Sequence, residues 1–344
     1  MTQPNAKKLG VLVRGAGWVA GEHIHAFQKN PHTEVRHIDA RSEAKIEGYF
    51  KKFNFRCGAS VERYEEALER DDIDIVSICT INYQHAQEAI LAAKAGKHVF
   101  IEKPAALNLK ELRALEAALK KSGVKSAMGF VCHYYPRIVS IKAQLEQGAL
   151  GKLFYAQAAY LHEVKGAWKA QKATSGSSLL MGGCHAIDLV RWFVGNDKPV
   201  KEVFAFANGP VRRKDFEYDP NIFVSFKYAD GTIAQVGSSL EANMPYAFDI
   251  NLMGTRGSVR GPLLYSENFP GAKAFLTIPG VGPDSGDVAH HPFDKMIDDF
   301  VAWVRGERKK PCENSTLDAV KTHEIIFAAE ESARTGKPVR LSLK

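Results

Sequence analysis

Residues 9–20 read LGVLVRGAGWVA, and this stretch decides the fold. Its first part, residues 9–13, is a short apolar run rich in β-branched residues, which is typical of a buried strand. Gly15 ends the run, and a helix-like pattern follows over residues 19–29. A strand, a glycine turn and a helix in this order predict the first βα unit of an α/β domain.

The same alternation continues to residue 130. The predicted strands cover residues 35–40, 73–80, 98–102 and 125–130, and the predicted helices cover residues 42–53, 64–70, 85–94 and 109–122. Gly96 and Gly123 stand where helices are expected to end. Strands joined through helices become parallel neighbours by right-handed crossovers. Residues 1–130 are therefore predicted to form a Rossmann domain, with a doubly wound parallel sheet that binds a dinucleotide.

The pattern changes after Gly151. Residues 222–228 and 232–239 alternate apolar and polar side chains across the turn at residues 229–231, as in an antiparallel hairpin. Residues 131–344 are therefore predicted to form an α+β domain that binds the substrate, with a large, open and mostly antiparallel sheet. Helices on one face leave the other face to be covered, often by a second subunit. Residues 293–335 are expected to be helical and to pack back on the first domain.

Composition excludes several classes of protein. The 344 residues are 45% hydrophobic and 25% charged, as in soluble globular chains of two domains. The net charge of +7 comes from basic residues spread among acids, and the runs at 212–214 and 308–310 are short. We therefore expect a solvated surface and no nucleic-acid partner. A modest positive field can still attract an anionic cofactor.

The cysteines, the histidines and the N-terminus bear on disulfides, metal sites and cellular location. The five cysteines are widely spaced and form no C-x-x-C pair, so neither a disulfide framework nor a thiolate zinc site is indicated. His290 and His291 have no third ligand at metal spacing, and no metal is expected. Residues 1–8 lead into a strand without signal-peptide features, and no later run reaches membrane-spanning length. We expect a cytoplasmic protein.

The glycine turn fits G-x-G-x-x-A with Gly15, Gly17 and Ala20. Such a turn lets the backbone approach a pyrophosphate at a helix N-terminus, although tight turns also occur in α/β proteins that bind no dinucleotide. Asp39 follows 24 positions after Gly15, near the spacing of the acid that binds the adenosine ribose. Because a carboxylate there repels the extra phosphate of NADP, NAD is favoured. Arg41 could instead grip that phosphate or lie in solvent, so NADP stays possible.

Three motifs carry a family resemblance. They are GAGWVA at 15–20, TINYQH at 80–85 and AGKHVFIEKP at 95–104. With them the chain resembles the glucose-fructose oxidoreductase and inositol dehydrogenase family (Gfo/Idh/MocA). The likeness extends through GALGK at 148–152, GCHAIDL at 183–189 and SARTGKPV at 332–339, so it covers essentially the whole chain.

The Glu-Lys-Pro step is the most specific of these motifs. Lys103 lies just beyond the carboxyl end of a predicted parallel strand, where such sheets bind ligands. A lysine there can bond substrate hydroxyls and stabilise an alkoxide, and the resemblance implies a place near the nicotinamide and the reacting carbon. Pro104 disfavours helix at Lys103. The predicted cofactor contacts are Gly15, Gly17, Trp18, Val19, Asp39, Arg41, Thr80, Asn82, His85, Glu102 and Lys103; His85 could instead cap its helix, and Ile81 replaces a proline common in the family.

His185 is the candidate catalytic base. Imidazole has an unperturbed pKa of about 6.5 and can take a hydroxyl proton as hydride leaves for nicotinamide. Asp188 shares its helix face and could orient the ring or pair elsewhere. The family often has an aspartate four residues before this histidine, and Met181 stands there. The proton relay could be altered, His185 could work with Lys103 alone, or the chemistry could differ from simple dehydrogenation.

The substrate pocket is assigned by resemblance and by position. The predicted substrate contacts are His133, Tyr160, His162, Trp168, Met181 and Asp188; His133 stands where many members carry arginine, and core packing or loop anchoring is an equal alternative for Tyr160, His162 and Trp168.

The expected activity is NAD(P)-dependent hydride transfer to or from a secondary alcohol of a sugar, glycoside or inositol. One alternative uses transient oxidation to cleave or epimerise a glycoside, and Met181 keeps it open. A non-catalytic dinucleotide sensor or scaffold of the same fold is another, against which the presence of both Lys103 and His185 argues. The resemblance also implies a homodimer or homotetramer.

Overall fold

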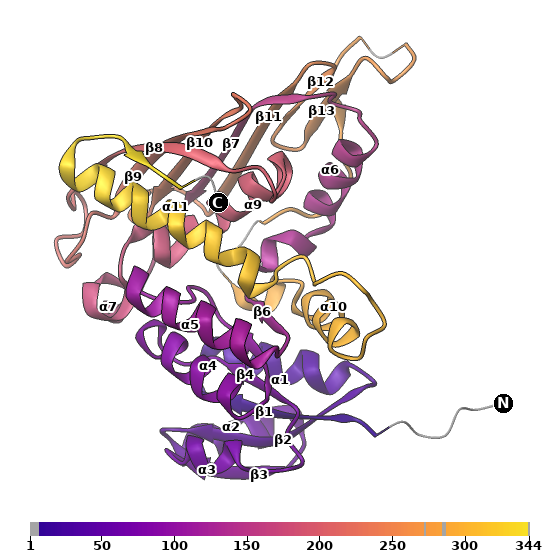
Figure 1. The fold of residues 1–344 in the computed structure, drawn as a ribbon, viewed down its shortest axis with the longest axis vertical. Coiled ribbons are helices and arrows are strands. Elements are labelled where there is room, and N and C mark those ends of the chain that lie inside the picture. The colour runs from indigo at the N-terminus through magenta and orange to yellow at the C-terminus, as the bar shows by residue number, and fades with distance from the viewer. Residues whose placement is uncertain (1–6, 272, 284–286, 343–344) are drawn as a thin grey trace. The chain divides into compact units, whose positions relative to one another are not determined.

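The computed structural model describes residues 7–271, 273–283 and 287–342. The chain forms two compact units, and each is described by itself (Figure 1). The first unit contains Met1–Val131 and Asp287–Val320, and the second contains Cys132–Gly286 and Lys321–Lys344. Residues after 286 therefore return to the first unit before the chain ends in the second.

The first unit is built on a six-stranded parallel sheet in the order β3-β2-β1-β4-β5-β6. Its strands are β1 Leu9–Arg14, β2 Thr33–Ala40, β3 Gly58–Val61, β4 Ile75–Ile78, β5 His98–Ile101 and β6 Ser126–Met128. The order reverses between β1 and β4, as in a doubly wound Rossmann sheet, so the predicted fold class is confirmed. Only β3 was not predicted, because this edge strand is mostly exposed and carries no apolar run.

Helices cover both faces of this sheet. They are α1 Trp18–Lys29, α2 Glu43–Phe53, α3 Tyr64–Leu68, α4 His85–Lys94, α5 Leu109–Ser122 and α10 Phe293–Val304, with short 3₁₀ turns at Asn82–Gln84 and Val288–His290. The chain passes from β1 to β2 in one direction along the sheet and from β4 to β5 in the opposite direction. Because each crossover is right-handed, α1 and α4 lie on opposite faces of the sheet. The helices α4 and α5 pack together, and so do α1 and α10 (Figure 1).

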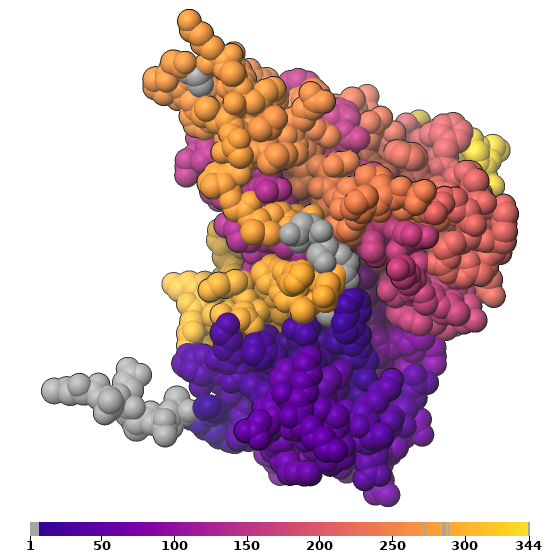
Figure 2. Space-filling model, turned by 180° about the vertical axis from the view of Figure 1, so that it is seen from behind, coloured from indigo at the N-terminus to yellow at the C-terminus, as the bar shows by residue number. Residues whose placement is uncertain are grey.

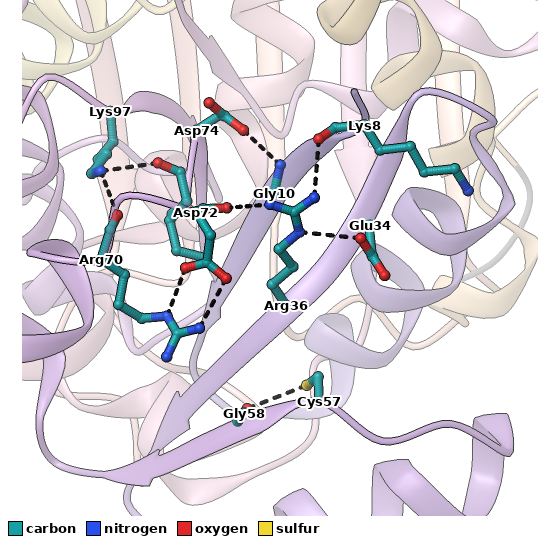
Figure 3. A network of polar contacts seen from close by, with 11 residues as sticks. Lys8, Gly10, Glu34, Arg36, Cys57, Gly58, Arg70, Asp72, Asp74 and Lys97 are labelled. Atoms are coloured by element: carbon teal, nitrogen blue, oxygen red, sulfur yellow. Dashed lines mark hydrogen bonds and ion pairs between the residues drawn. The ribbon is translucent and has the colours of Figure 1, made fainter. Parts of the chain in front are cut away.

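A polar network joins the amino ends of β1, β2 and β4 (Figure 3). Gly10 N donates to Asp74 Oδ2 at 2.7 Å, and Arg36 Nη1 donates to Asp72 O at 3.0 Å. A Cβ atom on Gly10 would lie 1.8 Å from Asp72 O, so no other residue fits there. Lys97 closes the network by donating to two backbone carbonyls. The network lies at the edge opposite the ligand edge, and its role is structural.

The second unit carries a nine-stranded sheet in the order β14-β13-β12-β11-β7-β10-β9-β8-β15. Its strands are β7 Leu153–Leu161, β8 Val200–Asn208, β9 Asn221–Tyr228, β10 Ile233–Ser239, β11 Ala247–Gly254, β12 Gly257–Arg260, β13 Leu263–Ser266, β14 Leu276–Thr277 and β15 Val339–Arg340. Only β7 and β10 pair in parallel, which confirms the predicted mostly antiparallel sheet. Figure 2 shows the orange segment that contains β13 and β14 projecting from one end of this unit.

Helices pack on one face of the large sheet. The helices of this part are α6 Pro136–Glu146, α7 Ala167–Ala170, α8 Lys172–Ser175, α9 Cys184–Val194 and α11 Thr316–Thr335, with a 3₁₀ turn at Val131–Tyr134 and a π-helical turn, η3, at Leu179–Gly183. The helix α9 packs on β7 and β10 (Figure 1). Along β9 the even-numbered residues are buried, whereas Phe223 on the other face is 64% exposed. Within the part of the chain that is described, no helix is long and apolar enough to cross a membrane.

Candidate active site

The glycine turn between β1 and α1 has the shape that a bound pyrophosphate needs. Gly15 has φ 106°, and a Cβ atom there would lie 2.7 Å from Cys79 O, so the turn requires glycine. Gly17 precedes α1 with an extended backbone, and the nearest atom to a Cβ built on it is 3.8 Å away. Trp18 is 59% exposed and Val19 is half-buried in the first turn of α1. The peptide groups here are open to an anion.

The loop after β4 supplies a second feature that fits a dinucleotide. Asn82 is 6% exposed, and its Nδ2 has no hydrogen-bond partner among the residues that the structure describes. An unpaired buried donor is costly, so an oxygen of a ligand is a suitable partner for it. Thr80 lies in the same loop, but its hydroxyl already donates to Glu88 Oε2 at 2.6 Å. Asn82 is therefore the better-placed cofactor contact of the two.

His85 is buried and is bonded to two loops of the chain. Its ring is 1% exposed, with Nδ1 2.7 Å from Pro104 O and Nε2 3.0 Å from Thr80 O. Both ring nitrogens are thus occupied by backbone carbonyls of the chain. The histidine at the start of α4 thus connects the two loops at the carboxyl edge, and its contact with the cofactor stays a prediction.

Asp39 lies near the carboxyl end of β2, as predicted, but its carboxylate points inward. It is 0% exposed and accepts hydrogen bonds from Arg14 Nη1, from Ser60 Oγ and, at 3.0 Å, from Arg63 N. No carboxylate oxygen is open to a ribose in this geometry. In this geometry the residue anchors β2 to its neighbours, and its role as the ribose acceptor stays a prediction.

Arg14 is the centre of a buried charge cluster that sequence reasoning missed. Its Nε donates to Glu88 Oε1 at 2.8 Å while Nη1 reaches Asp39, and the guanidinium lies 5.1 Å from the Tyr64 ring centre. Burial by itself lowers the pKa of Arg14, but Glu88 and Asp39 raise it above its ordinary value. In the sequence, this cluster is indicated by the arginine directly before Gly15, because it stands at the end of an apolar strand where no solvent is expected.

The Glu102–Pro104 turn presents Lys103 at the carboxyl edge. Lys103 is half-buried, and the bond to Pro104 is cis. Glu102 is 8% exposed and accepts a hydrogen bond from His23 Nε2 at 3.0 Å. The carboxylate of Glu102 is therefore turned into the unit, and of the predicted motif pair only Lys103 is presented at this edge.

In the second unit, His185 follows a π-helical turn. His185 is 8% exposed in the first turn of α9, directly after η3. A Cβ atom on Gly182 would lie 2.3 Å from Tyr160 Cε1, and one on Gly183 would lie 2.9 Å from Ser238 Cβ. The two glycines therefore let the turn press against β7 and β10. Such π turns are rare and frequently occur at functional sites.

Asp188 does not orient His185 but pairs with His133. Its Oδ2 accepts from His133 Nε2 at 2.5 Å, and its Oδ1 accepts from Thr322 Oγ1 at 2.9 Å. The His133 ring is 3% exposed and stacks on Trp192 with 4.5 Å between ring centres. Of the two roles open to Asp188, the structure shows pairing elsewhere. His133 and Asp188 are thus buried and bonded to each other, and their contacts with substrate stay predictions.

Met181 stands in an apolar cluster, one helical turn before His185. It packs with Val164, Phe216 and Leu240, and Tyr160 lies against the same cluster. The side chain is 8% exposed. An aspartate at this position would place a carboxylate among apolar groups, so the family arrangement cannot be restored here without cost.

The aromatic residues predicted near the substrate lie on β7, directly after it and on α7. Tyr160 makes edge contacts with Tyr246 at 5.5 Å and with His162 at 6.1 Å between ring centres. Burial raises the pKa of Tyr160, whereas burial and the nearby Lys169 lower the pKa of His162. Trp168 on α7 is 39% exposed and lies under the Lys169 ammonium. The structure thus brings Tyr160 beside the turn that carries Met181. In the described ranges, no group of three His, Cys, Asp or Glu side chains could hold a metal ion.

Comparison with known protein families settles the class. Residues 9–130 match the model described as an oxidoreductase family with an NAD-binding Rossmann fold, and residues 138–260 match the GFO/IDH/MocA C-terminal domain. The chain belongs to the GFO/IDH/MocA oxidoreductase family. The N-terminal unit of this oxidoreductase is thus an NAD-binding Rossmann domain.

Individual relatives of this oxidoreductase are distant. The chain is 27% identical over 289 residues to levoglucosan dehydrogenase of Pseudarthrobacter phenanthrenivorans, covering 74% of this chain and 73% of the relative. It is 28% identical over 289 residues to scyllo-inositol 2-dehydrogenase (NAD(+)) of Bacillus subtilis, covering 81% of each. A solved levoglucosan dehydrogenase in complex with NADH has the same fold, with a TM-score of 0.84 at 23% identity over 98% of this chain and 100% of that one.

Proposed function

We propose that this oxidoreductase transfers hydride between a nicotinamide cofactor and a secondary alcohol of a sugar, glycoside or inositol. The observation that carries the proposal is the half-buried Lys103, which follows β5 at the carboxyl edge of an NAD-binding Rossmann sheet. The names of the relatives, which act on levoglucosan and scyllo-inositol, support a polyhydroxylated substrate. His185, on the family's C-terminal domain, supplies the group that moves the proton.

The proposed chemistry divides between these two residues. When bound, the nicotinamide ring supplies the hydride acceptor. His185 takes the hydroxyl proton on an imidazole nitrogen, and the Lys103 ammonium stabilises the negative charge that develops on the same oxygen. Asp188, held by His133 and Thr322, fixes α9 and with it the backbone of His185.

The proposal is tested with a substrate panel. Purified protein is mixed with sugars, glycosides and inositols in the presence of NAD or NADP, and the absorbance of reduced nicotinamide is followed. Reduction of the cofactor by at least one alcohol is the expected result. If no alcohol reduces either cofactor although both bind, the proposed dehydrogenase activity is refuted.

A second candidate function rests on Met181. Because no carboxylate stands at that position, net oxidation could give way to transient oxidation that enables glycoside cleavage or epimerisation. In that case the glycoside would disappear without accumulation of reduced cofactor. Product analysis by chromatography on the same panel separates the two activities.

The burial of Asp39 bears on whether the protein can bind NADP as well as NAD. With Asp39 bound to Arg14 and with Ala40 as the last residue of β2, no free carboxylate repels the 2′-phosphate of NADP. The next residue, Arg41, is exposed directly before Ser42, which caps α2. An arginine beside a helix N-terminus suits a phosphate. We therefore propose that this oxidoreductase can bind NADP as well as NAD.

The test compares the Kd values of NADP and NAD, read from the fluorescence of the exposed Trp18 or by calorimetry. Arg41→Ala is expected to weaken NADP by about tenfold, the loss of about 1.4 kcal/mol, and to leave NAD unchanged. Arg56→Ala is the matched control, because Arg56 is also exposed and pairs with Glu47. No measurable binding of NADP to the wild-type protein would contradict this proposal.

We also propose that a second copy covers the open face of the large sheet. Phe206 on β8 and Phe223 on β9 are directly opposite each other in register and are 71% and 64% exposed. The other apolar residues of β9 face the helices. Ile233 on β10 and Met253 on β11, which are 48% and 44% exposed, add to the apolar character of the open face. Exposed aromatic patches of this kind mark interfaces.

Light scattering at micromolar concentration is expected to show a dimer or a tetramer of the 38.0 kDa chain. The variant Phe206→Lys/Phe223→Glu is expected to dissociate it, because the rings of both copies would be lost from the contact. Only a monomer in the wild-type protein would refute self-association. We propose a reducing, cytoplasmic setting for the oligomer, because the five cysteines are widely spaced and form no C-x-x-C pair.

A further inference from the structure

His23 and Glu102 form a buried pair beside Lys103. His23 lies on α1 with 0% exposure, and its Nε2 is 3.0 Å from Glu102 Oε1. Its Nδ1 is 2.8 Å from Ser77 Oγ, on β4. Glu102, which follows β5, is 8% exposed. The His23 side chain of α1 thus contacts both β4 and Glu102, the residue that precedes Lys103.

The surroundings of the pair exclude water. The His23 ring makes an edge contact with Phe100 at 5.2 Å and lies 5.1 Å from Phe293 between ring centres. On the other side, a Cβ atom on Gly129 would lie 2.6 Å from Glu102 Oε1. Glycine at 129 is therefore what makes room for the carboxylate. A polar pair in so enclosed a place interacts strongly and has little freedom to rearrange.

The electrostatic surroundings favour the charged form of both members of the pair. Burial lowers the pKa of His23, but the Cys79 thiol and the Glu102 carboxylate raise it to about 10. Burial raises the pKa of Glu102, but His23, and further Lys103 and His85, lower it below its ordinary value. Both shifts favour an imidazolium that faces a carboxylate at 3.0 Å.

Lys103 is connected to this pair through the backbone. Lys103 N donates to Glu102 Oε2 at 3.3 Å, so both oxygens of the carboxylate are engaged on the inner side. On the other side of Lys103, the carbonyl of Pro104 is held by His85. Two buried histidines, from α1 and α4, thus fix the turn before and after the lysine.

We propose that His23 is a positioning residue, which binds Glu102 as its counter-ion and thereby keeps that carboxylate from pairing with the Lys103 ammonium. The proposal rests on the proposed role of Lys103 in hydride transfer. Without the imidazolium, the Glu102 carboxylate loses its counter-ion. The nearest cation along the chain is then the ammonium of the next residue, Lys103. The charge that should stabilise the alkoxide would then be neutralised.

The first test is a double-mutant cycle on turnover. His23→Gln is expected to lower kcat by about 10- to 100-fold, as expected for a misplaced catalytic group. Glu102→Gln is expected to cost less, because a neutral amide does not trap Lys103. The double variant His23→Gln/Glu102→Gln is expected to recover to within about threefold of Glu102→Gln alone. A merely structural role predicts the reverse, with the double variant at or below His23→Gln, and that result would overturn the proposal. His25→Gln, on the exposed face of the same helix, is the control.

The second test needs no turnover. Nuclear magnetic resonance of protein with labelled histidine is expected to show His23 as an imidazolium at about pH 8, where an ordinary histidine is neutral. The signal is assigned by its loss in His23→Gln, and NAD binding is measured on the same samples. A neutral His23 ring at that pH overturns the inference whatever the turnover. If the ring is charged but no alcohol reduces the cofactor, the proposed function fails and the ion pair stands.

Discussion

Replacing His185 with alanine is expected to lower turnover by about 10²- to 10⁴-fold, while the Kd of NAD stays nearly unchanged. The residue follows the π turn on the second unit, whereas the glycine turn and Asn82 belong to the first unit. Loss of a positioned base therefore removes chemistry without removing cofactor contacts. Lys103→Ala is expected to reduce both turnover and substrate binding, because it removes a charge and a hydrogen-bond donor.

Steady-state kinetics on a confirmed substrate, with cofactor binding measured in parallel, check this prediction. The control is His25→Ala, which changes an exposed histidine of α1 and should leave both quantities at the wild-type level. Near-normal turnover in His185→Ala would move the search for the base to His162 and Tyr160. Tyr160 is then the nearer candidate, because its ring lies against Gly182.

Replacing Arg14 with methionine is expected to lower the free energy of unfolding by about 3–5 kcal/mol. Methionine fills a similar volume but leaves Asp39 and Glu88 buried, at 0% and 5% exposure, without the cation between them. The loss is therefore that of uncompensated buried charge. Urea denaturation followed by circular dichroism measures it.

The matched control for this stability change is Arg56→Met. Arg56 pairs with Glu47 at the surface, and such exposed pairs contribute about 0–1 kcal/mol. Equal and small losses in the two variants would show that the Arg14 cluster is not the anchor described above. A loss in Arg14→Met that disappears in the triple variant with Asp39→Asn and Glu88→Gln would identify the stranded carboxylates as its cause.

The sequence predicted the fold well wherever local pattern and topology agree. The runs at β1, β4 and β5 are buried and apolar, and the glycines at 15, 123 and 151 adopt positive φ values, so the elements lie close to where periodicity places them. The edge strand β3 was missed because it buries little. The π turn at Leu179–Gly183 has no periodic signature, because one residue is added to a helix whose pattern otherwise continues.

The candidate site was predicted less completely, because residue type and spacing do not say which way a side chain points. Asp39 has the predicted position, yet the neighbouring strand supplies Arg14 and turns the carboxylate inward. Asp188 has the predicted helix face, yet its partner His133 is 55 positions away. Long-range polar pairs of this kind arise from packing and cannot be derived from one stretch of chain.

The central claim is hydride transfer from a secondary alcohol to nicotinamide, and transfer of deuterium tests it most directly. A substrate found with the panel is prepared with deuterium on the carbon that bears the reacting hydroxyl, and the reduced cofactor is analysed by mass spectrometry. The account predicts one deuterium on the nicotinamide ring, formed about 10²- to 10⁴-fold more slowly in His185→Ala and also more slowly in Lys103→Ala. Reduced cofactor without deuterium, or substrate conversion with no transfer to the cofactor at any stage, would contradict it.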